Sequence, residues 1–303
     1  MNGVLILDKP AGLTSHDVVN RVRRILQQRS IGHLGTLDPM ATGVLPLVTG
    51  SLTRLAQFYT ASEKCYEGTV RFGFSTDTYD ARGEPTSTPK EVRLLVDQIE
   101  AQAARFRGVI EQTPPPFSAK KIQGVPAYKL ARKQKEVVLK PVQVEIKEFT
   151  ILSVDADRAR FRARVASGTY MRSVAHEMGQ ALGCGAHLES LRRTAVAEFT
   201  IEDAHTLEQL AAVKGKDALD DFFIHPRKLL PELPSVTADE PTAARIRSGR
   251  TVNLPELSRA RQVKVFSGQR DLIAIATRIA GSLFHPKIVF ATDLSSQPAL
   301  PGQ

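Results

Sequence analysis

The segment Gly32–Leu47, with the sequence GHLGTLDPMATGVLPL, constrains the fold of this chain more than any other stretch. Its three glycines and two prolines disfavour a helix, and proline cannot donate a hydrogen bond to a sheet. The residues between them are largely apolar. The pattern predicts a tight loop that presents one carboxylate, Asp38, and one imidazole, His33. Loops of this kind on a rigid scaffold often carry chemistry.

The role of an isolated Asp in such a loop is open. Asp38 can form a turn, act as a nucleophile or general base, or bind a metal, and the turn is the commonest of these roles. His176 and Glu177 are adjacent, so they face different ways on a helix, and the chain has no H-E-x-x-H motif. It also lacks a G-x-S-x-G elbow and the glycine motifs of nucleotide sites. A glycosidase would require paired carboxylates, and Asp77 and Asp80, on a separate loop, are candidate partners for Asp38.

The charge of the chain leaves two interpretations. Its 303 residues carry a formal net charge of +9, typical either of a solvated surface or of a protein that contacts a polyanion. Between Lys120 and Lys140 there are seven basic residues and one acid, Glu136. This local excess favours phosphate contacts, whereas three alternate arginines further on fit either a solvated sheet face or a phosphate track. These are Arg160, Arg162 and Arg164.

The composition is ordinary for a globular protein, and no run of about 18 apolar residues predicts a membrane span. The N-terminus lacks the pattern of a signal peptide. Cys65 and Cys184 are too few for a disulfide framework or a cysteine metal cage. We therefore expect a cytoplasmic protein without a membrane partner.

Periodicity predicts alternating strands and helices, and hence a mixed, mainly antiparallel α+β domain. We expect strands over 4–7, 65–74, 142–146 and 161–165, an extended connector over 113–118, and helices over 15–26, 89–103, 127–133 and 171–182. The third of these helices lies in the basic segment.

A proline-rich segment divides the chain into two predicted domains. The prolines between Pro226 and Pro234 predict a linker. A short helix, 243–247, and three strand-like pieces, 262–266, 272–278 and 287–289, follow it. We predict a catalytic domain over 1–229 with a basic insertion at about 118–141, a β-rich domain over 230–291, and a flexible tail over 292–303.

Five segments in order along the chain resemble the motifs of a known family, the bacterial TruB family of tRNA pseudouridine-55 synthases. The loop 32–46 matches its signature, with Leu34, Met40 and, on the following strand, Phe72 as small apolar departures. The other four segments are 8–15, 76–83, 115–121, and 168–173 taken with 182–188 and 191–194. The part of the chain after about Pro231 more weakly resembles a PUA domain, through residues 243–250.

The resemblance implies a fold and a reaction. It implies a mixed, mainly antiparallel sheet with flanking helices and a central cleft, followed by a small β-rich pseudobarrel that binds RNA. The family isomerises one uridine in the T-loop of tRNA: the base leaves C1′ through N1, turns, and rejoins through C5. Bond count and redox state are conserved, so no cofactor, metal or ATP is expected. The resemblance to a stand-alone bacterial family implies that no guide RNA or obligate protein partner is needed.

The resemblance also assigns roles to individual residues. Asp38 becomes the catalytic carboxylate, and Arg172 pairs with it and keeps it ionised and oriented. Tyr66 stacks on the flipped base and recovers part of the unstacking cost, although the pattern alone favours a core residue on a strand. Tyr170 and Leu191 become walls of the pocket.

Further roles follow from the same resemblance. His33 fills the space that the flipped nucleotide leaves, while Lys9 and Asp80 support the site through ion pairs. The basic insertion clamps the T-arm of tRNA, and its charges suit phosphate contacts. The residues expected to contact RNA are Lys120, Lys121, Lys129, Arg132 and Lys133.

Three other functions compete with this prediction. A guide-dependent enzyme related to dyskerin shares the aspartate loop and the PUA domain but lacks the basic insertion. A non-enzymatic RNA-binding module would not require Asp38, Tyr66 and Arg172 together. An aspartate-based hydrolase requires a metal site or a close carboxylate pair, and the sequence shows neither.

Overall fold

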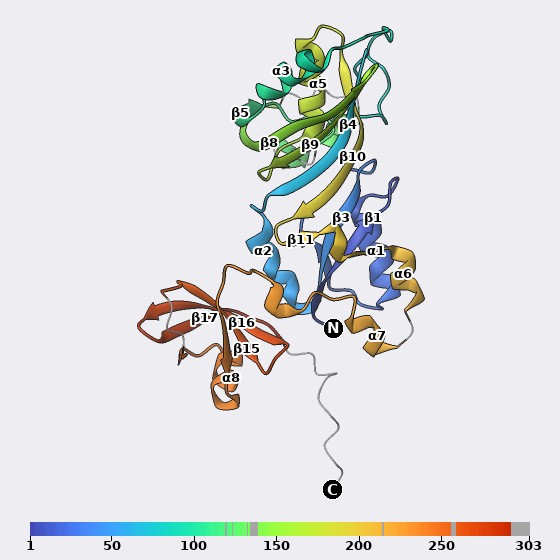
Figure 1. Ribbon diagram of the computed structural model, residues 1–303. Coiled ribbons are helices and arrows are strands. Elements are labelled where there is room, and N and C mark those ends of the chain that lie inside the picture. The colour runs from blue at the N-terminus through green and yellow to red at the C-terminus, as the bar shows by residue number, and fades with distance from the viewer. Residues whose placement is uncertain are drawn as a thin grey trace.

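Two sheets dominate the computed structural model, which describes residues 1–118, 120–122, 124–131, 133, 139–213, 215–255 and 259–291 (Figure 1). The strands of the large sheet are β1 (Gly3–Lys9), β2 (Ile31–His33), β3 (Thr42–Thr49), β4 (Lys64–Phe72), β5 (Gly108–Gln112), β8 (Val142–Asp155), β9 (Arg158–Val165), β10 (Ala186–Val196), β11 (Phe199–Thr200) and β12 (Ala204–His205). Their order is β12-β1-β3-β10-β4-β9-β8-β5, with β2 on β3 and β11 on β10.

The large sheet is mainly antiparallel within the described residues. Only the pairs β1–β12 and β3–β10 are parallel there. Its helices are α1 (Ser15–Ile25), α2 (Ala56–Tyr59), α3 (Val96–Ala104), α5 (Met171–Ala181), α6 (Leu207–Ala212) and α7 (Lys216–Asp220), with 3-10 helices η1 (Gly50–Leu55), η2 (Ile201–Asp203) and η3 (Pro226–Lys228). The predicted α+β class with a mixed, mainly antiparallel sheet is confirmed.

One face of the sheet is covered by α1, α3, α5 and α6, whose apolar residues join a single core cluster with the strands. Helix α1 forms where the pattern predicts. Thr14 caps it, because its hydroxyl accepts a bond from the Asp17 amide while the Asp17 carboxylate accepts from the Thr14 amide. Val18 and Val22, on the inner side of this helix, are fully buried. This helix packs behind the strand that leads to the Asp38 loop.

The segment around Asp38 is less of a loop than the sequence predicts. Its ends are strands β2 and β3, and only 34–41 lies between them. The judgement that 42–47 is poor strand material is wrong, because Pro46 pairs with Ile6 of β1. The carbonyl of Pro46 points away from β1 and accepts a bond from the Leu34 amide. The missing proline N–H would point the same way, so no bond to β1 is lost.

Helix α3 begins at Val96, which corrects the prediction that it starts after Thr88. The segment 86–90 instead runs along 73–75: the Thr86 amide donates to Ser75, and the Lys90 amide donates to Gly73. In the sequence, Thr88 and Pro89 suit a helix cap and a first helical position, but pairing with a distant segment overrides this local signal.

The long strand β10 was not predicted, although two of the matched motifs overlap it. It runs beside β4 through the middle of the sheet (Figure 1) and bridges the half that holds β1 and β3 to the half that holds β8 and β9. It carries Leu191 and Arg193 into the site described below.

The arginines of β9 lie on the face opposite the core. Arg162 pairs with Glu67 of β4 at 2.8 Å, and Arg164 pairs with Glu63 at 3.2 Å and Glu148 at 2.5 Å. Of the two interpretations of this face, a solvated sheet surface fits better, because these cations already have carboxylate partners.

The predicted basic insertion contains a two-stranded pair, β6 (Lys121–Ile122) and β7 (Val125–Pro126), and a short helix, α4 (Ala127–Ala131). Lys120, Lys129 and Lys133 are exposed. Arg132 and the side chain of Lys121 lie outside the described part, so their predicted RNA contacts are not addressed by the structure.

The C-terminal part forms its own sheet, which accords with the predicted β-rich pseudobarrel. Its strands are β13 (Ser235–Ala238), β14 (Val252–Asn253), β15 (Gln262–Ser267), β16 (Asp271–Ala280) and β17 (Leu283–Val289), in the order β13-β15-β16-β17-β14, with helix α8 (Glu240–Arg247) beside them. The predicted tail, 292–303, lies outside the described residues. The domain boundaries remain a prediction.

Candidate active site

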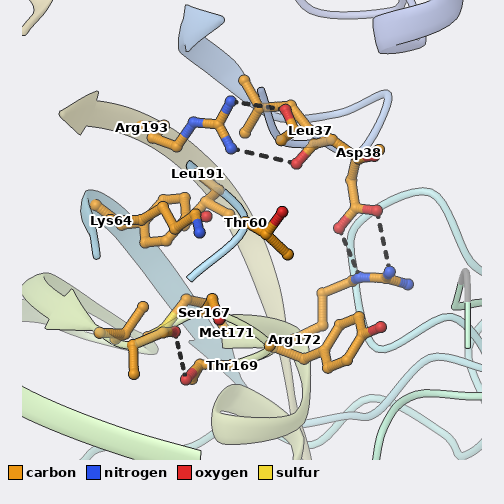
Figure 2. A pocket seen from close by; sticks show the side chains of 17 residues that line it. Leu37, Asp38, Thr60, Lys64, Ser167, Thr169, Met171, Arg172, Leu191 and Arg193 are labelled. Atoms are coloured by element: carbon orange, nitrogen blue, oxygen red, sulfur yellow. Dashed lines mark hydrogen bonds and ion pairs between the residues drawn. The ribbon is translucent and has the colours of Figure 1, made fainter. Parts of the chain in front are cut away.

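A cavity of about 430 Å³ opens beside Asp38 (Figure 2). Its walls come from segments far apart in the sequence. They are the loop residues 35–38, the start of β4, the turn 165–170 with the first residues of α5, and β10. The site thus lies between the two halves of the large sheet, where the sequence resemblance places a central cleft.

Asp38 and Arg172 form a two-contact ion pair across this cavity. Arg172 Nε lies 2.9 Å from one Asp38 oxygen, and Arg172 Nη2 donates to the other at 3.0 Å. The arginine side chain is 5% exposed and the aspartate 34%. The geometry fixes the carboxylate in one orientation while leaving an edge of it open to the cavity.

Asp80 lies behind the same arginine, with its carboxylate 3.9 Å from Arg172 Nε. It also accepts bonds from the Thr78 hydroxyl at 2.8 Å and the Arg82 amide at 3.0 Å. Arg172 donates in addition to the carbonyls of Thr78 and Phe117. The buried arginine therefore joins the Asp38 loop to two other matched motifs, and the predicted ion-pair role of Asp80 has a geometric basis.

Lys9 supports the loop differently from what the sequence suggests. Its side chain is fully buried, and its ammonium donates to the carbonyls of Leu13 at 2.7 Å, Pro10 at 2.9 Å and Pro39 at 3.4 Å. It makes no ion pair with a described carboxylate, so the expectation of a direct pair is corrected. Burial lowers the pKa of Lys9 to about 8, although the charge of Asp38 acts in the opposite direction.

Arg193 is a site residue whose role the sequence did not reveal. Its side chain is 1% exposed and donates to the carbonyls of Val44 at 2.8 Å, Gly35 at 3.1 Å and Thr36 at 3.2 Å. Burial lowers the pKa of Arg193, while the neighbouring Tyr66 acts in the opposite direction. The place of Arg193 in the matched motif 191–194 was the available signal. Through these hydrogen bonds, the Arg193 side chain holds the backbone of the Asp38 loop from the buried side.

The predicted walls of the pocket come together as expected. Tyr66, Tyr170 and Leu191 all line the cavity, and Tyr66 and Leu191 are both largely buried. Burial raises the pKa of Tyr66 and of Tyr170, so both phenols stay protonated. The core and stacking roles of Tyr66 are compatible, because its ring belongs to the core cluster and also faces the cavity.

His33 is not among the residues that line the cavity. It ends β2, half-buried, and its Nδ1 accepts a bond from the Gly35 amide at 3.3 Å. Burial lowers its pKa and favours the neutral ring. The structure thus places it at the base of the Asp38 loop.

Lys64 is a second lining residue that the sequence analysis missed. It begins β4, two residues before Tyr66, and alternate residues of a strand project to the same face. That alternation was the available signal.

The described residues contain no group of three or more His, Cys, Asp or Glu side chains that could hold a metal ion. In the same part of the chain, no helix has the length and apolar character needed to cross a membrane.

Solved structures share this architecture. An H/ACA ribonucleoprotein bound to a substrate RNA containing 2′-deoxyuridine has a chain with a TM-score of 0.70 and 24% identity, which covers 96% of this chain and 85% of its own. A chain of a Cbf5–Nop10–Gar1 complex gives 0.69 and 25%, with 95% and 85% covered. The fold is that of the pseudouridine synthases.

Sequence comparisons define the family. Residues 23–171 match the TruB family pseudouridylate synthase N-terminal domain, and residues 172–229 match the tRNA pseudouridylate synthase B C-terminal domain. The tRNA pseudouridine synthase B of Solibacter usitatus is 53% identical over 95% of this chain and 100% of its own length. That of Aquifex aeolicus is 38% identical over 95% and 99%. The chain belongs to the TruB family, as its motifs predict.

Proposed function

We propose that this protein isomerises a uridine of tRNA to pseudouridine, acting on position 55 in the T-loop. The relatives that match nearly the whole chain carry the name tRNA pseudouridine synthase B. The observation that carries the proposal to this chain is the ion pair of Asp38 with the buried Arg172 at the edge of a cavity walled by Tyr66 and Leu191.

The reaction exchanges one glycosidic bond for another. The C1′–N1 bond breaks, the uracil turns, a C1′–C5 bond forms, and the C5 proton is lost while N1 gains one. No electrons or groups enter or leave, so the balance requires no cofactor or metal. Asp38 supplies the carboxylate on which cleavage of C1′–N1 depends, and the two contacts with Arg172 fix its orientation at the cavity.

The target base must leave the folded T-loop to reach Asp38. Extrusion costs a few kcal/mol of stacking, and the Tyr66 ring in the wall offers a new stacking surface. His33, at the base of the loop, is the group we assign to the space that the base vacates. The exposed Lys120, Lys129 and Lys133 suit phosphate contacts with the T-arm, and we assign the same role to Lys121 and Arg132.

We further propose that the protein acts without guide RNA or obligate protein partners. The structural relatives in H/ACA and Cbf5 complexes are 24–25% identical to this chain, whereas two relatives named tRNA pseudouridine synthase B are 38% and 53% identical to it. Cys65 and Cys184 are free thiols, in keeping with a reducing cytoplasm. The C-terminal sheet would add RNA contacts as a PUA-like domain.

Release of label from C5 tests the reaction directly. An unmodified tRNA transcript carrying tritium at uridine C5 is incubated with the purified protein alone. We expect release of one tritium per tRNA, and none from a transcript in which uridine 55 is replaced by cytidine. Absence of release without added guide RNA would overturn the proposal.

Replacing the catalytic carboxylate separates chemistry from binding. Asp38→Asn keeps the shape of the side chain but removes its charge, so we expect tritium release to fall at least about 10⁴-fold while the Kd for tRNA stays within a few fold. Single-turnover release and filter binding measure the two effects. Asp77→Asn, an exposed position on the neighbouring loop, should leave both unchanged. An active D38N variant would show that Asp38 has only a structural role.

A further inference from the structure

The cavity contains a cation that the ion pair of Asp38 does not use. Lys64 lines the wall opposite Asp38 (Figure 2). Its ammonium makes one hydrogen bond within the described residues, to the Ser62 carbonyl at 2.5 Å, and no ion pair with a carboxylate there. An ammonium has three donors, so two of them remain for a ligand.

The other two cations of the cavity are already engaged. Arg172 is bound by Asp38 and faces Asp80, and Arg193 gives its donors to three backbone carbonyls of the loop. Lys64 and Arg193 also converge on Gly35. A methyl group on that glycine would lie 4.0 Å from Lys64 Cε and 3.6 Å from Arg193 Nη1. Two positive charges therefore approach one another with no carboxylate between them in the described structure.

Burial, and then the charge of Arg193, lower the pKa of Lys64 to about 8. Both effects destabilise the charged form of Lys64, and an anion beside the ammonium would stabilise that form. Among the groups of an RNA strand only the phosphodiester is anionic. A base offers neutral carbonyls, which do not require a charged partner.

We propose that Lys64 binds a phosphate that flanks the target nucleotide, at the side of the cavity opposite Asp38. The nucleotide then lies across the cavity, with its sugar and base at Asp38 and Tyr66 and its backbone at Lys64. This inference rests on the proposed function, since it assumes that a nucleotide enters this cavity. Lys64 is a substrate-binding residue and takes no part in proton transfer.

Removing the charge of one phosphate at a time tests the contact. Three T-arm stem-loops are prepared, each with 2′-deoxyuridine at the target and a 2′-deoxy sugar before it. One has normal phosphates, one a neutral methylphosphonate 5′ to the target, and one a methylphosphonate 3′ to it. Dissociation constants are measured for the wild type, Lys64→Met, Lys64→Arg and Lys147→Met.

We expect Lys64→Met to bind the all-phosphate stem-loop about tenfold more weakly than the wild type. One of the two methylphosphonates should weaken the wild type by a similar factor and leave Lys64→Met unchanged, which identifies the phosphate. Lys64→Arg keeps the charge and should retain both the affinity and the sensitivity. Lys147, which pairs with Glu63, is a control with the same change of charge.

Two results would overturn the proposal. One is a Lys64→Met variant that binds as tightly as the wild type. The other is a methylphosphonate penalty that is equal in Lys64→Met and in the wild type at both positions. If Lys64→Met does not fold, Lys64→Gln, which also removes the charge, takes its place: loss of one methylphosphonate penalty in it supports the contact, and penalties equal to those of the wild type contradict it. Tritium release from the all-ribose stem-loop by the wild type reports separately on the proposed function.

Discussion

Buried cations hold the Asp38 loop mainly by its backbone. Arg193 binds the carbonyls of Gly35 and Thr36 from inside the sheet, and Lys9 approaches the carbonyl of Pro39 from the other side. Arg172 alone among them contacts the carboxylate. Because Arg193 and Lys9 bind carbonyls, they hold the loop by its backbone and leave the Asp38 carboxylate to Arg172.

Arg193 is assigned no contact with the substrate, but its replacement should destabilise the Asp38 loop. We expect Arg193→Met to lower the free energy of unfolding by about 3 kcal/mol, because the buried carbonyl of Val44 and the part-buried carbonyls of Gly35 and Thr36 lose their donor. Urea unfolding at pH 7 measures this. The neighbouring Arg192→Met removes an arginine that is 42% exposed and pairs with Asp8, and should cost less than about 1 kcal/mol. Equal losses of stability in the two variants would show that Arg193 does not hold the Asp38 loop.

The affinity for RNA should depend on pH through Lys64. Its pKa of about 8 in the free protein means that it is charged below pH 8 and loses its proton above it. A bound phosphate favours the charged form, so we expect Kd to rise above pH 8, at most tenfold per pH unit.

The groups around Lys64 define the control for this pH dependence. Arg193 of β10, Tyr66 of β4, Asp38 of the loop and Arg172 of α5 share its cavity. Lys9 also has a pKa of about 8, so a rise in Kd alone does not identify Lys64. Lys64→Arg does not titrate in this range and should give a flat profile between pH 8 and 9.5. A rise that persists in Lys64→Arg would assign it to another group.

At the scale of elements, the contact between α5 and β10 sets the geometry of the site. Gly179 of α5 packs so closely on the start of β10 that a Cβ there would lie 2.0 Å from the Ala186 amide nitrogen. Arg172 lies at the other end of the same helix, and Leu191 and Arg193 lie on the same strand. A displacement of α5 from β10 would therefore separate Arg172 from Asp38.

We expect Gly179→Ala to lower the free energy of unfolding by more than about 2 kcal/mol, because the clash is with backbone that cannot rotate away. Tritium release should also fall at least about tenfold in the folded fraction. Denaturation curves and single-turnover rates measure both. Gln180→Ala, the next and exposed position of the helix, provides the control and should change neither. A Gly179→Ala variant with native rate and stability would contradict this account of the contact.

The elements also show where local patterns suffice. Helix α1 and strand β4 follow their periodicity, because the capping box at Thr14 and the alternation from Tyr66 to Phe72 agree with the packing around them. Helix α3 and strand β10 do not follow local signals. The segment before α3 is bound to 73–75, and β10 gains its partners from β3 and β4. Long-range pairing of this kind leaves no pattern within a short window.

At the scale of the whole molecule, the C-terminal sheet packs against strands β1 and β3 of the large sheet. Phe266, Leu272 and Ile288 share a buried cluster with Val4 and Val48 of strands β1 and β3. The Glu198 carboxylate binds both the Tyr59 hydroxyl at 2.6 Å and the Leu230 amide at 2.9 Å, where the chain enters this sheet. Deleting the residues after about 230 would expose this cluster, so a loss of RNA affinity in such a truncation would not by itself report on RNA contacts.

Charge changes on the outer face of that sheet test its role more cleanly. A shallow pocket of the C-terminal sheet has three exposed residues in its lining that can carry positive charge, Arg261, His285 and Lys287. We expect Arg261→Glu with Lys287→Glu to weaken tRNA binding about tenfold or more, to reduce the salt dependence of binding, and to leave single-turnover tritium release unchanged. The double variant Glu202→Gln with Asp220→Asn, at exposed acids elsewhere, should not weaken binding. Unchanged affinity in the first variant would remove this face from the RNA contacts.

The sequence by itself determined the family and the reaction class and predicted the central residues of the site, because the chemical groups involved lie in short motifs that can be recognised without the fold. Asp38, Tyr66, Tyr170, Arg172 and Leu191 all meet at the cavity that the motifs imply. The tertiary structure decided how they are held. That Lys9 binds carbonyls rather than a carboxylate, that Arg193 clamps the loop, and that Lys64 faces Asp38 depend on contacts between segments up to about 160 residues apart. Such contacts are set by packing and charge burial across the sheet, which no local pattern encodes.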